Sequence, residues 1–564
     1  EIWRPHEQWV VAVSLLPETE ADPATLRDHG LVFIEGRDIL SCPATPSEPE
    51  PWAKLAERTS CRPHTLDELP GDFSFLHFDA QGALTSVRAC GGRVPLYLWQ
   101  GSGRAAVATR MHYLIRHAGA APRLDAMVCG IWATGFPLLP DARSPIADVY
   151  ILPRGRTARL RRSGGFHITP YWDPRPDRLP IPPAGLQEEH GRRLRALLLS
   201  YLERELDARG ANLLTLSGGA DSASLAALAA GTLGKTISTW SMLPPPGPAL
   251  DLEASYISPL LRSLRVKNQF RVHCQLGDRV DMQAQSPFAA MPIPHPALCA
   301  LPGLLGKQPI RVLFGGEMAD ELVGSRNFTL PDWLTHTSLR RLLTAPGAWP
   351  RGYRDPAAWV KARWAHLRRN PPVPAPARLR AFSPARLQEE YRDWLGGHIR
   401  RAAADRRPLR FLALRCELDG VLPMNWEACS ALGIRRAWPF FHREILDLAF
   451  TCHPCELIGP GDKRLLRRAL VNDVPAHNLQ RTDAGHWGAA IRGAPPARHG
   501  PLPDALHAVV DPAWLQPHGQ APKPMDEADA LGIEFLRIFA LRAHACAKPQ
   551  TPTCATTAAG AGIP

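Results

Sequence analysis

The sequence predicts a protein of mixed α+β and α/β class, with a β-rich first domain followed by a larger α/β domain built on a parallel sheet. Three observations lead to this prediction. Short apolar runs punctuated by Gly and Pro fill residues 1–172, and a Pro-rich stretch follows them. Beyond that stretch, helical periodicity alternates with short apolar strands. The 564 residues are enough for two large domains.

The first domain, residues 1–172, is predicted from apolar runs that have the length and the turn-forming flanks of β-strands. The clearest runs are residues 9–13, 31–34, 73–78 and 105–108. Residues 41–51 carry several prolines and are predicted to form a loop.

A Pro-rich linker, residues 173–185, is predicted between the domains because Pro stiffens a linker and cannot pair inside a central sheet. The second domain is predicted over residues 186–546. It opens with helical periodicity over residues 188–209, where one face carries Leu194, Leu197, Leu198, Tyr201 and Leu202. Strands are predicted at 212–216, 236–240 and 310–314, with a helix at 223–230. Strand, helix and strand at this spacing favour a parallel sheet.

The remaining segments have a biased composition. Residues 331–410 are rich in Trp, Arg and Pro, and we expect helices and loops added outside the sheet. Residues 547–564 are rich in Ala, Thr, Pro and Gly, which predicts a disordered tail.

The net charge of +12 favours anionic partners. A nucleotide and a peptide are preferred over nucleic acid, because the basic residues are spread along the chain rather than clustered. The chain has no apolar run long enough to predict a membrane span, and residues 1–6 are polar, unlike a signal peptide. A cytoplasmic protein is therefore expected.

The 12 cysteines are scattered, which excludes a disulfide scaffold in a chain of this length. The segment Cys452-His453-Pro454-Cys455 has CxxC spacing without a second pair nearby. A zinc or redox role is one interpretation. Packed, reduced thiols are the other, and we favour it.

The strongest local motif follows the strand predicted at 212–216 and precedes a helix. It reads Ser217-Gly218-Gly219-Ala220-Asp221-Ser222. Two glycines let the backbone approach an anion, and N–H groups at a helix start present partial positive charge. The carboxylate of Asp221 would repel a naked phosphate, which suggests a bridging Mg²⁺. No Lys follows, so a P-loop is excluded, and an ordinary Gly-rich turn is the alternative.

A second cluster follows the strand predicted at 310–314. It contains three carboxylates within five residues, Glu317, Asp320 and Glu321. Such carboxylates repel one another unless something cationic offsets them. Both clusters would meet outside the carboxyl ends of the parallel strands, where open α/β sheets bind ligands. A solvated acidic loop is the alternative, but the two clusters together favour a metal–nucleotide site.

These motifs resemble a known family. The segment 217–222 is similar to the pyrophosphate-binding loop of ATP pyrophosphatases, and with segment 316–322 it resembles the synthetase half of the asparagine-synthetase B type. Segments 69–75, 92–97, 151–155 and 171–172 resemble the family's N-terminal domain, and 438–441 and 461–467 resemble its C-terminal motifs. The resemblance implies a glutaminase-type (Ntn-like) β-rich sandwich, followed by an ATP-pyrophosphatase domain of the adenine nucleotide α-hydrolase type.

The family's chemistry implies roles for the matching residues. A carboxylate attacks the α-phosphate of ATP, and an amine then attacks the acyl-adenylate as AMP leaves. By resemblance, Asp221 and Asp320 hold Mg²⁺, and Glu317 is the base for the amine. The remaining nucleotide-binding positions are Leu216, Ser217, Gly218, Gly219, Ser222 and Gly316. Lys463 belongs to the C-terminal motif of the site and is expected to act in catalysis.

Three departures from the family narrow the substrate. The chain begins with Glu1 rather than the nucleophilic Cys, so glutaminase activity is not expected if that start is native. The family's pocket motif, an acidic residue, x, Arg, x, Pro-Phe-Leu-Asp, is replaced over residues 435–442 by Arg-Arg-Ala-Trp-Pro-Phe-Phe-His, which argues against free aspartate. Asp483 stands where the family has a charge-stabilising Lys, and either the register shifts or Arg481 supplies that charge.

These losses resemble the lasso-peptide cyclases, or macrolactam synthetases. Such enzymes join the N-terminal amine of a leaderless precursor peptide to an Asp or Glu side chain, and one would work beside a leader peptidase. The alternatives are a β-lactam synthetase-like enzyme, against which the retained Glu317 argues, and an ammonia-dependent asparagine synthetase-like enzyme. A non-catalytic peptide-binding protein on a synthetase scaffold is the alternative from a different class.

Overall fold

The computed structural model describes the chain in segments: residues 2–6, 9–12, 25–27, 31–35, 55–59, 62–69, 72–101, 104–132, 142–160, 165–173, 183–243, 248–264, 266–273, 303–304, 306, 309–324, 332–333, 383–404, 422–423, 425–430, 432–458 and 462–481. The predicted loop at 41–51, the centre of the linker, most of 331–410 and the predicted tail at 547–564 lie outside these segments.

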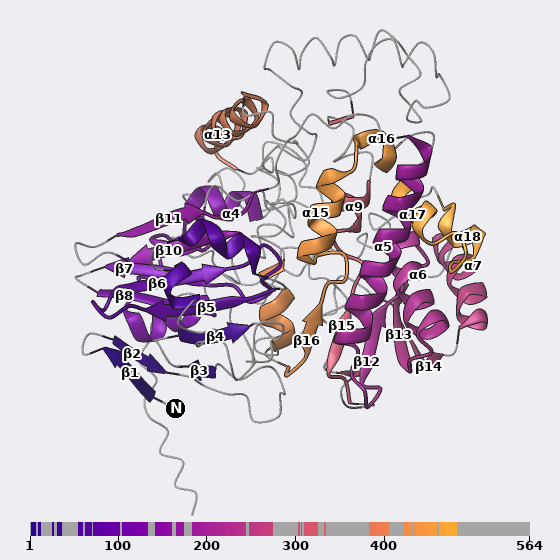
Figure 1. The fold of residues 1–564 in the computed structure, drawn as a ribbon, viewed down its shortest axis with the longest axis horizontal. Helices are drawn as coiled ribbons and strands as arrows, with labels where there is room; N and C mark the ends of the chain where they lie inside the picture. The colour runs from indigo at the N-terminus through magenta and orange to yellow at the C-terminus, as the bar shows by residue number, and fades with distance from the viewer. Residues whose placement is uncertain are drawn as a thin grey trace, which may run out of the picture.

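The first part of the chain is built from antiparallel sheets (Figure 1). A six-stranded sheet has the order β11-β10-β6-β5-β4-β3, a three-stranded sheet has the order β8-β7-β9, and β1 and β2 form a hairpin. The strands are β1 Ile2–His6, β2 Trp9–Ala12, β3 Thr25–Arg27, β4 Leu31–Glu35, β5 Ser74–Phe78, β6 Leu84–Arg88, β7 Tyr97–Gly101, β8 Arg104–Ala108, β9 Val149–Ile151, β10 Arg156–Leu160 and β11 Phe166–Pro170. All four predicted apolar runs are confirmed as strands.

The two larger antiparallel sheets pack face to face. Leu76, Phe78 and Leu84 of the six-stranded sheet contact Ala105 and Val107 of β8. Every residue of β5 and β6 is buried, so these two strands are covered on both faces. Continuous burial explains why β5 reads as an apolar run rather than as a clean alternation.

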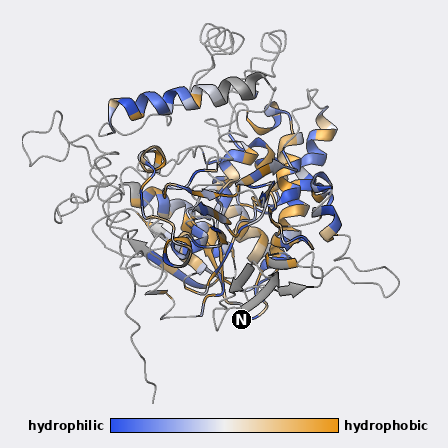
Figure 2. Cartoon of the chain, turned by 90° about the vertical axis from the view of Figure 1, so that its left-hand side faces the viewer, coloured by the Kyte–Doolittle hydropathy of each residue, from blue (hydrophilic) through white to orange (hydrophobic). Residues whose placement is uncertain are grey.

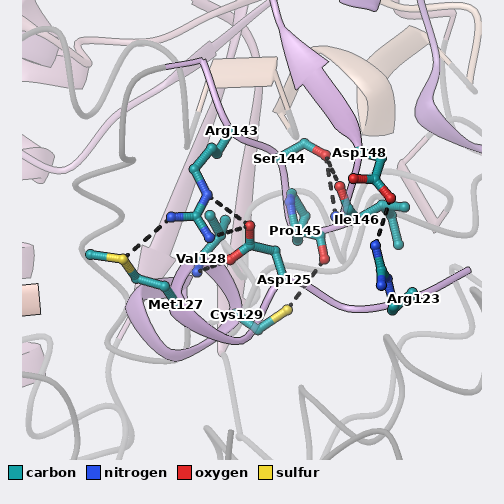
Figure 3. A network of polar contacts seen from close by, with 10 residues as sticks. All are labelled: Arg123, Asp125, Met127, Val128, Cys129, Arg143, Ser144, Pro145, Ile146 and Asp148. Carbon is teal, nitrogen blue, oxygen red and sulfur yellow. Dashed lines mark hydrogen bonds and ion pairs between the residues drawn. The ribbon is translucent and has the colours of Figure 1, made fainter. Parts of the chain in front are cut away.

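A short helix, α4 (Ala126–Trp132), is fixed to this domain by one carboxylate (Figure 3). Asp125 accepts a hydrogen bond from the backbone N–H of Val128 at 3.1 Å and one from Nε of Arg143 at 2.8 Å. The other face of α4 packs against α13 (Ala385–Ala404), an element of the second half of the chain. The segment predicted to lie outside the sheet therefore contains a helix that contacts the first domain.

The second half of the chain is built on a five-stranded parallel sheet of order β14-β13-β12-β15-β16. The strands are β12 Asn212–Thr215, β13 Ile237–Leu243, β14 Val266–His273, β15 Val312–Phe314 and β16 Arg435–Ala437. The helices are α5 Ala184–Glu205, α6 Ala220–Ala226, α7 Pro248–Ser263, α9 Ala319–Val323, α15 Arg443–Thr451, α16 Pro454–Leu457, α17 Arg464–Ala469 and α18 Ala476–Leu479. The predicted parallel sheet is confirmed.

Two helix boundaries differ from the sequence-based predictions. The helix predicted over 188–209 runs from Ala184 to Glu205. It ends early because the side chain of Asn212 accepts from the N–H of Asp207 at 2.8 Å and donates to its carbonyl at 3.0 Å, which closes a turn. The helix predicted from residue 223 begins at Ala220, and a π-helical segment continues it over Ala227–Thr232.

The core of the second domain lies between its helices and the sheet. On α5, Leu194, Leu198, Tyr201 and Leu202 are buried as the periodicity predicts, and Leu197 is half-buried. Several helices in Figure 2 show both hydrophobic and hydrophilic residues. Within the described residues, no helix is both long and apolar enough to cross a membrane.

Helix α15 connects the two halves of the molecule, since it contacts α5 and lies beside the first domain (Figure 1). Arg443, at its start, pairs with Asp67 at 2.6 Å and lies over the ring of Trp172. The indole N–H of Trp172 donates to Asp447 at 3.3 Å. Trp172, which closely follows β11, is therefore attached directly to the helix that follows β16.

Candidate functional site

The candidate site lies at the point where the strand order of the parallel sheet reverses. Strands β12 and β15 are neighbours at the centre of the sheet, with Leu214 opposite Phe314. The loops that follow them therefore emerge side by side at the carboxyl edge, where open α/β sheets bind ligands. A Cβ atom on Gly316 would lie 3.0 Å from Cβ of Asp221, so the two predicted clusters are in contact.

The loop after β12 (residues 216–219) is a tight turn with internal hydrogen bonds. The hydroxyl of Ser222 lies 3.1 Å from the Ser217 hydroxyl and accepts from the Ser217 backbone N–H at 3.1 Å. Gly218 has a φ of +69°, which a side chain would disfavour. Gly219 caps α6, and Asp221 lies in the first turn of that helix. Leu216 is buried beneath the loop and donates its N–H to Trp240 at 2.8 Å.

The same loop is supported from below by residues distant in sequence. Nδ2 of Asn478 donates to the carbonyl of Gly218 at 3.1 Å, and Nη1 of Arg481 donates to that of Ser217 at 3.0 Å. A Cβ on Gly218 would approach Cβ of Tyr256 to 2.7 Å. These contacts fix the carbonyls of Ser217 and Gly218 through residues that lie outside the loop.

Arg481, predicted as a source of catalytic charge, is itself paired. Both of its terminal nitrogens contact the carboxylate of Glu253, one of them at 3.0 Å. Its guanidinium lies 4.3 Å from the ring centroid of Tyr256, and its side chain is 4% exposed. The structure therefore places Arg481 beneath the Gly-rich loop, where it holds the Ser217 carbonyl and pairs with Glu253.

The carboxylates of Asp221 and Asp320 converge on one cation. Nζ of Lys463 pairs with Asp221 and lies 2.9 Å from Oδ1 of Asp320. Lys463 adopts a left-handed conformation, with φ +57°, and its N–H donates to the carbonyl of Gly324 at 2.7 Å. Met318, at the start of α9, is also left-handed, with φ +73°. Such backbone strain in non-Gly residues clusters at functional sites.

Burial shapes the protonation of this group. It raises the pKa of Asp221, and the nearby charge of Asp320 raises it further, whereas Lys463 opposes the rise. Burial alone would lower the pKa of Lys463, but the two carboxylates outweigh it and the pKa is raised. Lys463 therefore stays charged between the two carboxylates.

The donor set fits Mg²⁺. Asp221 and Asp320 already share one cationic partner, and hard carboxylate oxygens are the ligands that Mg²⁺ takes. Oδ1 of Asp221 is buried, and no hydrogen-bond partner for it is found among the described residues. A Mg²⁺ ion held by Asp221 and Asp320 would supply a partner for that oxygen.

Glu317 has a partner that the sequence-based prediction missed. Arg436, on β16, pairs with Oε1 of Glu317 and donates to the carbonyl of Leu313 at 3.1 Å. The Arg436 side chain is 2% exposed and the Glu317 side chain 22%. The only available signal was that residues 435–442 depart from the family motif, and it did not indicate which carboxylate Arg436 would meet.

The residues at the first and last positions of that motif, both replaced in this chain, have other partners. Arg435 pairs with Glu205, which also pairs with Arg93 of the first domain at 3.0 Å. His442 lies 3.1 Å from Glu444 and 3.0 Å from Arg204. Arg435 and His442 thus contact residues of α5 and α15.

A parallel sheet whose switch point joins a Gly-rich anion loop to clustered carboxylates defines an α/β nucleotide-binding domain. A family model described as Asparagine synthase matches residues 193–513, more than half of the chain. The chain therefore belongs to the asparagine synthase family, whose chemistry is ATP-dependent amide formation, usually with Mg²⁺. A comparison with curated proteins gave no match.

Proposed function

We propose that the protein closes a macrolactam ring in a leaderless precursor peptide, with ATP consumed to AMP and pyrophosphate. The observation that carries this proposal is the set of partners that residues 435–442 have in the structure. In place of the family's pocket motif, Arg435 and His442 are held by Glu205 and Glu444. We infer that this change of partners disfavours a free amino acid, and that a peptide side-chain carboxylate, which presents fewer charges, is the substrate.

In the first step, an Asp or Glu side-chain oxygen of the peptide attacks the α-phosphorus of ATP. The bond to the β-phosphate breaks, and pyrophosphate leaves with that electron pair. The Ser217 hydroxyl and the backbone N–H groups of Gly218 and Gly219 would bind the pyrophosphate, and Asp221 and Asp320 would hold a Mg²⁺ ion that offsets its charge. Lys463, fixed between them, supplies a further positive charge.

In the second step, the peptide's N-terminal amine attacks the acyl carbon and AMP leaves. The amine must lose a proton, and Glu317 is the base assigned to it. Arg436 contacts Oε1 of Glu317 and orients the carboxylate. The sum is an amide in place of an amine and a carboxylic acid, with the water accounted for by ATP cleavage. A leader peptidase would supply the leaderless peptide.

The test is mass spectrometry of the linear, leaderless peptide encoded beside this gene, incubated with the protein, ATP and Mg²⁺. We expect the loss of one water, with AMP formed in equal amount. Glu317→Gln should retain pyrophosphate–ATP exchange and slow ring closure by about 10²–10⁴-fold. Equal loss of both steps would assign Glu317 to binding rather than to proton transfer.

Two results would replace the proposal. AMP formed only with a small amino acid and ammonia would indicate an amidotransferase. Peptide binding with no ATP turnover would indicate a non-catalytic binding protein.

The matched control for Glu317→Gln is Asp251→Asn, which changes an exposed carboxylate on α7. This variant should behave like the unmodified protein.

A further inference from the structure

A second cluster of donor atoms lies outside the candidate site, where α5 meets the segment between α15 and α16. It consists of Nδ1 of His190, Sγ of Cys452 and a carboxylate oxygen of Glu456, all within 4.8 Å of one another. His190 comes from the first half of α5, Cys452 directly follows α15, and Glu456 lies on α16. We propose that these three side chains bind a structural Zn²⁺ ion that fastens α16 to α5.

The geometry suits one ion. Sγ of Cys452 lies 3.6 Å from Nδ1 of His190. Bond lengths of ~2.3 Å to sulfur and ~2.0 Å to nitrogen put two donors of a tetrahedral zinc ion roughly 3.5 Å apart. Oε2 of Glu456 lies 2.8 Å from the same Nδ1, so this pair opens by only a few tenths of an ångström. Nδ1 of His190 is shared by both contacts. An ion bound to this nitrogen would therefore lie within reach of Cys452 and Glu456.

Charge and burial favour a cation here. Cys452 is fully buried and Glu456 is 1% exposed. A thiolate, a carboxylate and a neutral imidazole together cancel the charge of one Zn²⁺ ion, so the bound site is neutral in a poorly solvated region. Mixed sulfur, nitrogen and oxygen donors select zinc over Mg²⁺. A water molecule can complete the tetrahedron.

The neighbouring backbone already orients the donors. The N–H of His453 donates to Oε1 of Glu456 at 2.9 Å, which leaves Oε2 directed at His190. The N–H of Cys455 donates to Nδ1 of His453 at 3.1 Å, in a reciprocal cap at the start of α16. The three clustered donors do not include Cys455, the second cysteine of the CxxC segment. The proposed ligands are Cys452 and two residues that the CxxC spacing does not reveal.

This ion would support the candidate site without belonging to it. A Cβ on Gly324 would lie 2.5 Å from the carbonyl oxygen of Leu457, so the end of α9 is packed tightly on α16. The carbonyl of Gly324 in turn accepts from the N–H of Lys463 at 2.7 Å. Fastening α16 therefore also steadies the backbone that presents Lys463.

The experiment uses the full-length chain without an affinity tag. The protein is stripped with a chelator, incubated with Zn²⁺, desalted and measured by inductively coupled plasma mass spectrometry. We expect about one tightly held Zn²⁺ per chain, and its loss in both Cys452→Ser and Glu456→Gln. Cys455→Ser removes a buried thiol from the same segment and should keep the zinc, and Asp221→Asn should also keep it.

A spectroscopic measurement provides an independent readout. Co²⁺ added to the stripped protein should give a thiolate-to-metal charge-transfer band, which persists in Cys455→Ser and disappears in Cys452→Ser. Zinc should raise the Tm of the unmodified protein but not that of Glu456→Gln. Less than about 0.1 Zn²⁺ per chain in the unmodified protein would overturn the proposal. Equal zinc content and an unchanged cobalt band in Cys452→Ser would overturn it as well.

Discussion

The two loops at the switch point of the sheet are held in different ways. The Gly-rich loop is supported from beneath through its carbonyls, by Asn478 and Arg481. The carboxylate loop after β15 is held through its side chains, by Arg436 on Glu317 and Lys463 on Asp320. The first loop is therefore fixed through its backbone. In the second, Glu317 and Asp320 each have a cationic partner.

The largest expected effect comes from removing the carboxylate charge of Asp221, which pairs with Lys463. Asp221→Asn should lower pyrophosphate–ATP exchange by about 10³-fold, because a metal ligand and the main partner of Lys463 are lost together. Exchange assays over a range of Mg²⁺ concentrations measure this. Exchange within a few-fold of the unmodified protein would remove Asp221 from the metal site.

The second largest effect is expected from the Arg481–Glu253 ion pair beneath the Gly-rich loop. Arg481→Met leaves the partly buried Glu253 without its ion-pair partner and should cost about 3 kcal/mol in the free energy of unfolding. The double variant Glu253→Gln with Arg481→Met should recover much of that stability, and pyrophosphate–ATP exchange with it. Denaturant melts and exchange assays on the three variants measure both. Recovered stability without recovered exchange would show that Arg481 supplies catalytic charge.

A third test concerns the strand that carries Arg436. Burial alone would raise the pKa of Glu205, but Arg93 and Arg435 outweigh it and lower the pKa to about 2. The ionised Glu205 therefore stabilises the fold above its unfolded-state pKa of 4.5, and this contribution, about 3 kcal/mol, is lost as the pH falls from 4.5 towards 2.

Stability measured by urea melts across that range checks the prediction. The difference between the unmodified protein and Glu205→Gln should shrink as the pH falls. A difference that stays constant with pH would mean that Glu205 is not ionised in the native state.

The smallest expected effect comes from the close contact between Gly218 and Tyr256. Gly218→Ala should destabilise the fold by about 2 kcal/mol, because a left-handed residue acquires a Cβ that collides with Tyr256. Gly234→Ala is the matched control, since φ is +61° there and no atom lies within 4 Å of the new Cβ. It should cost about 1 kcal/mol. Equal costs in thermal melts would mean that the loop yields to the added methyl group.

Much of the fold followed from local sequence pattern. The predicted strands of both halves form, and the parallel sheet forms as the strand–helix–strand spacing indicated. The boundaries of α5 and α6 were less accurate, because a side-chain contact from Asn212 and the cap at Gly219 decide them. The domain boundaries and the catalytic roles of the site residues stay predictions.

The sequence by itself determined which residue types follow β12 and β15, and hence that a Gly-rich loop and a carboxylate cluster share one edge. A residue's position after a strand is local information. Only the tertiary structure decided the partners: Lys463 between Asp221 and Asp320, Arg436 on Glu317, Arg481 on Glu253, and His190 beside Cys452 and Glu456. Most of these pairs are separated by more than a hundred residues, so their contacts depend on how the sheet and helices pack and not on spacing along the chain.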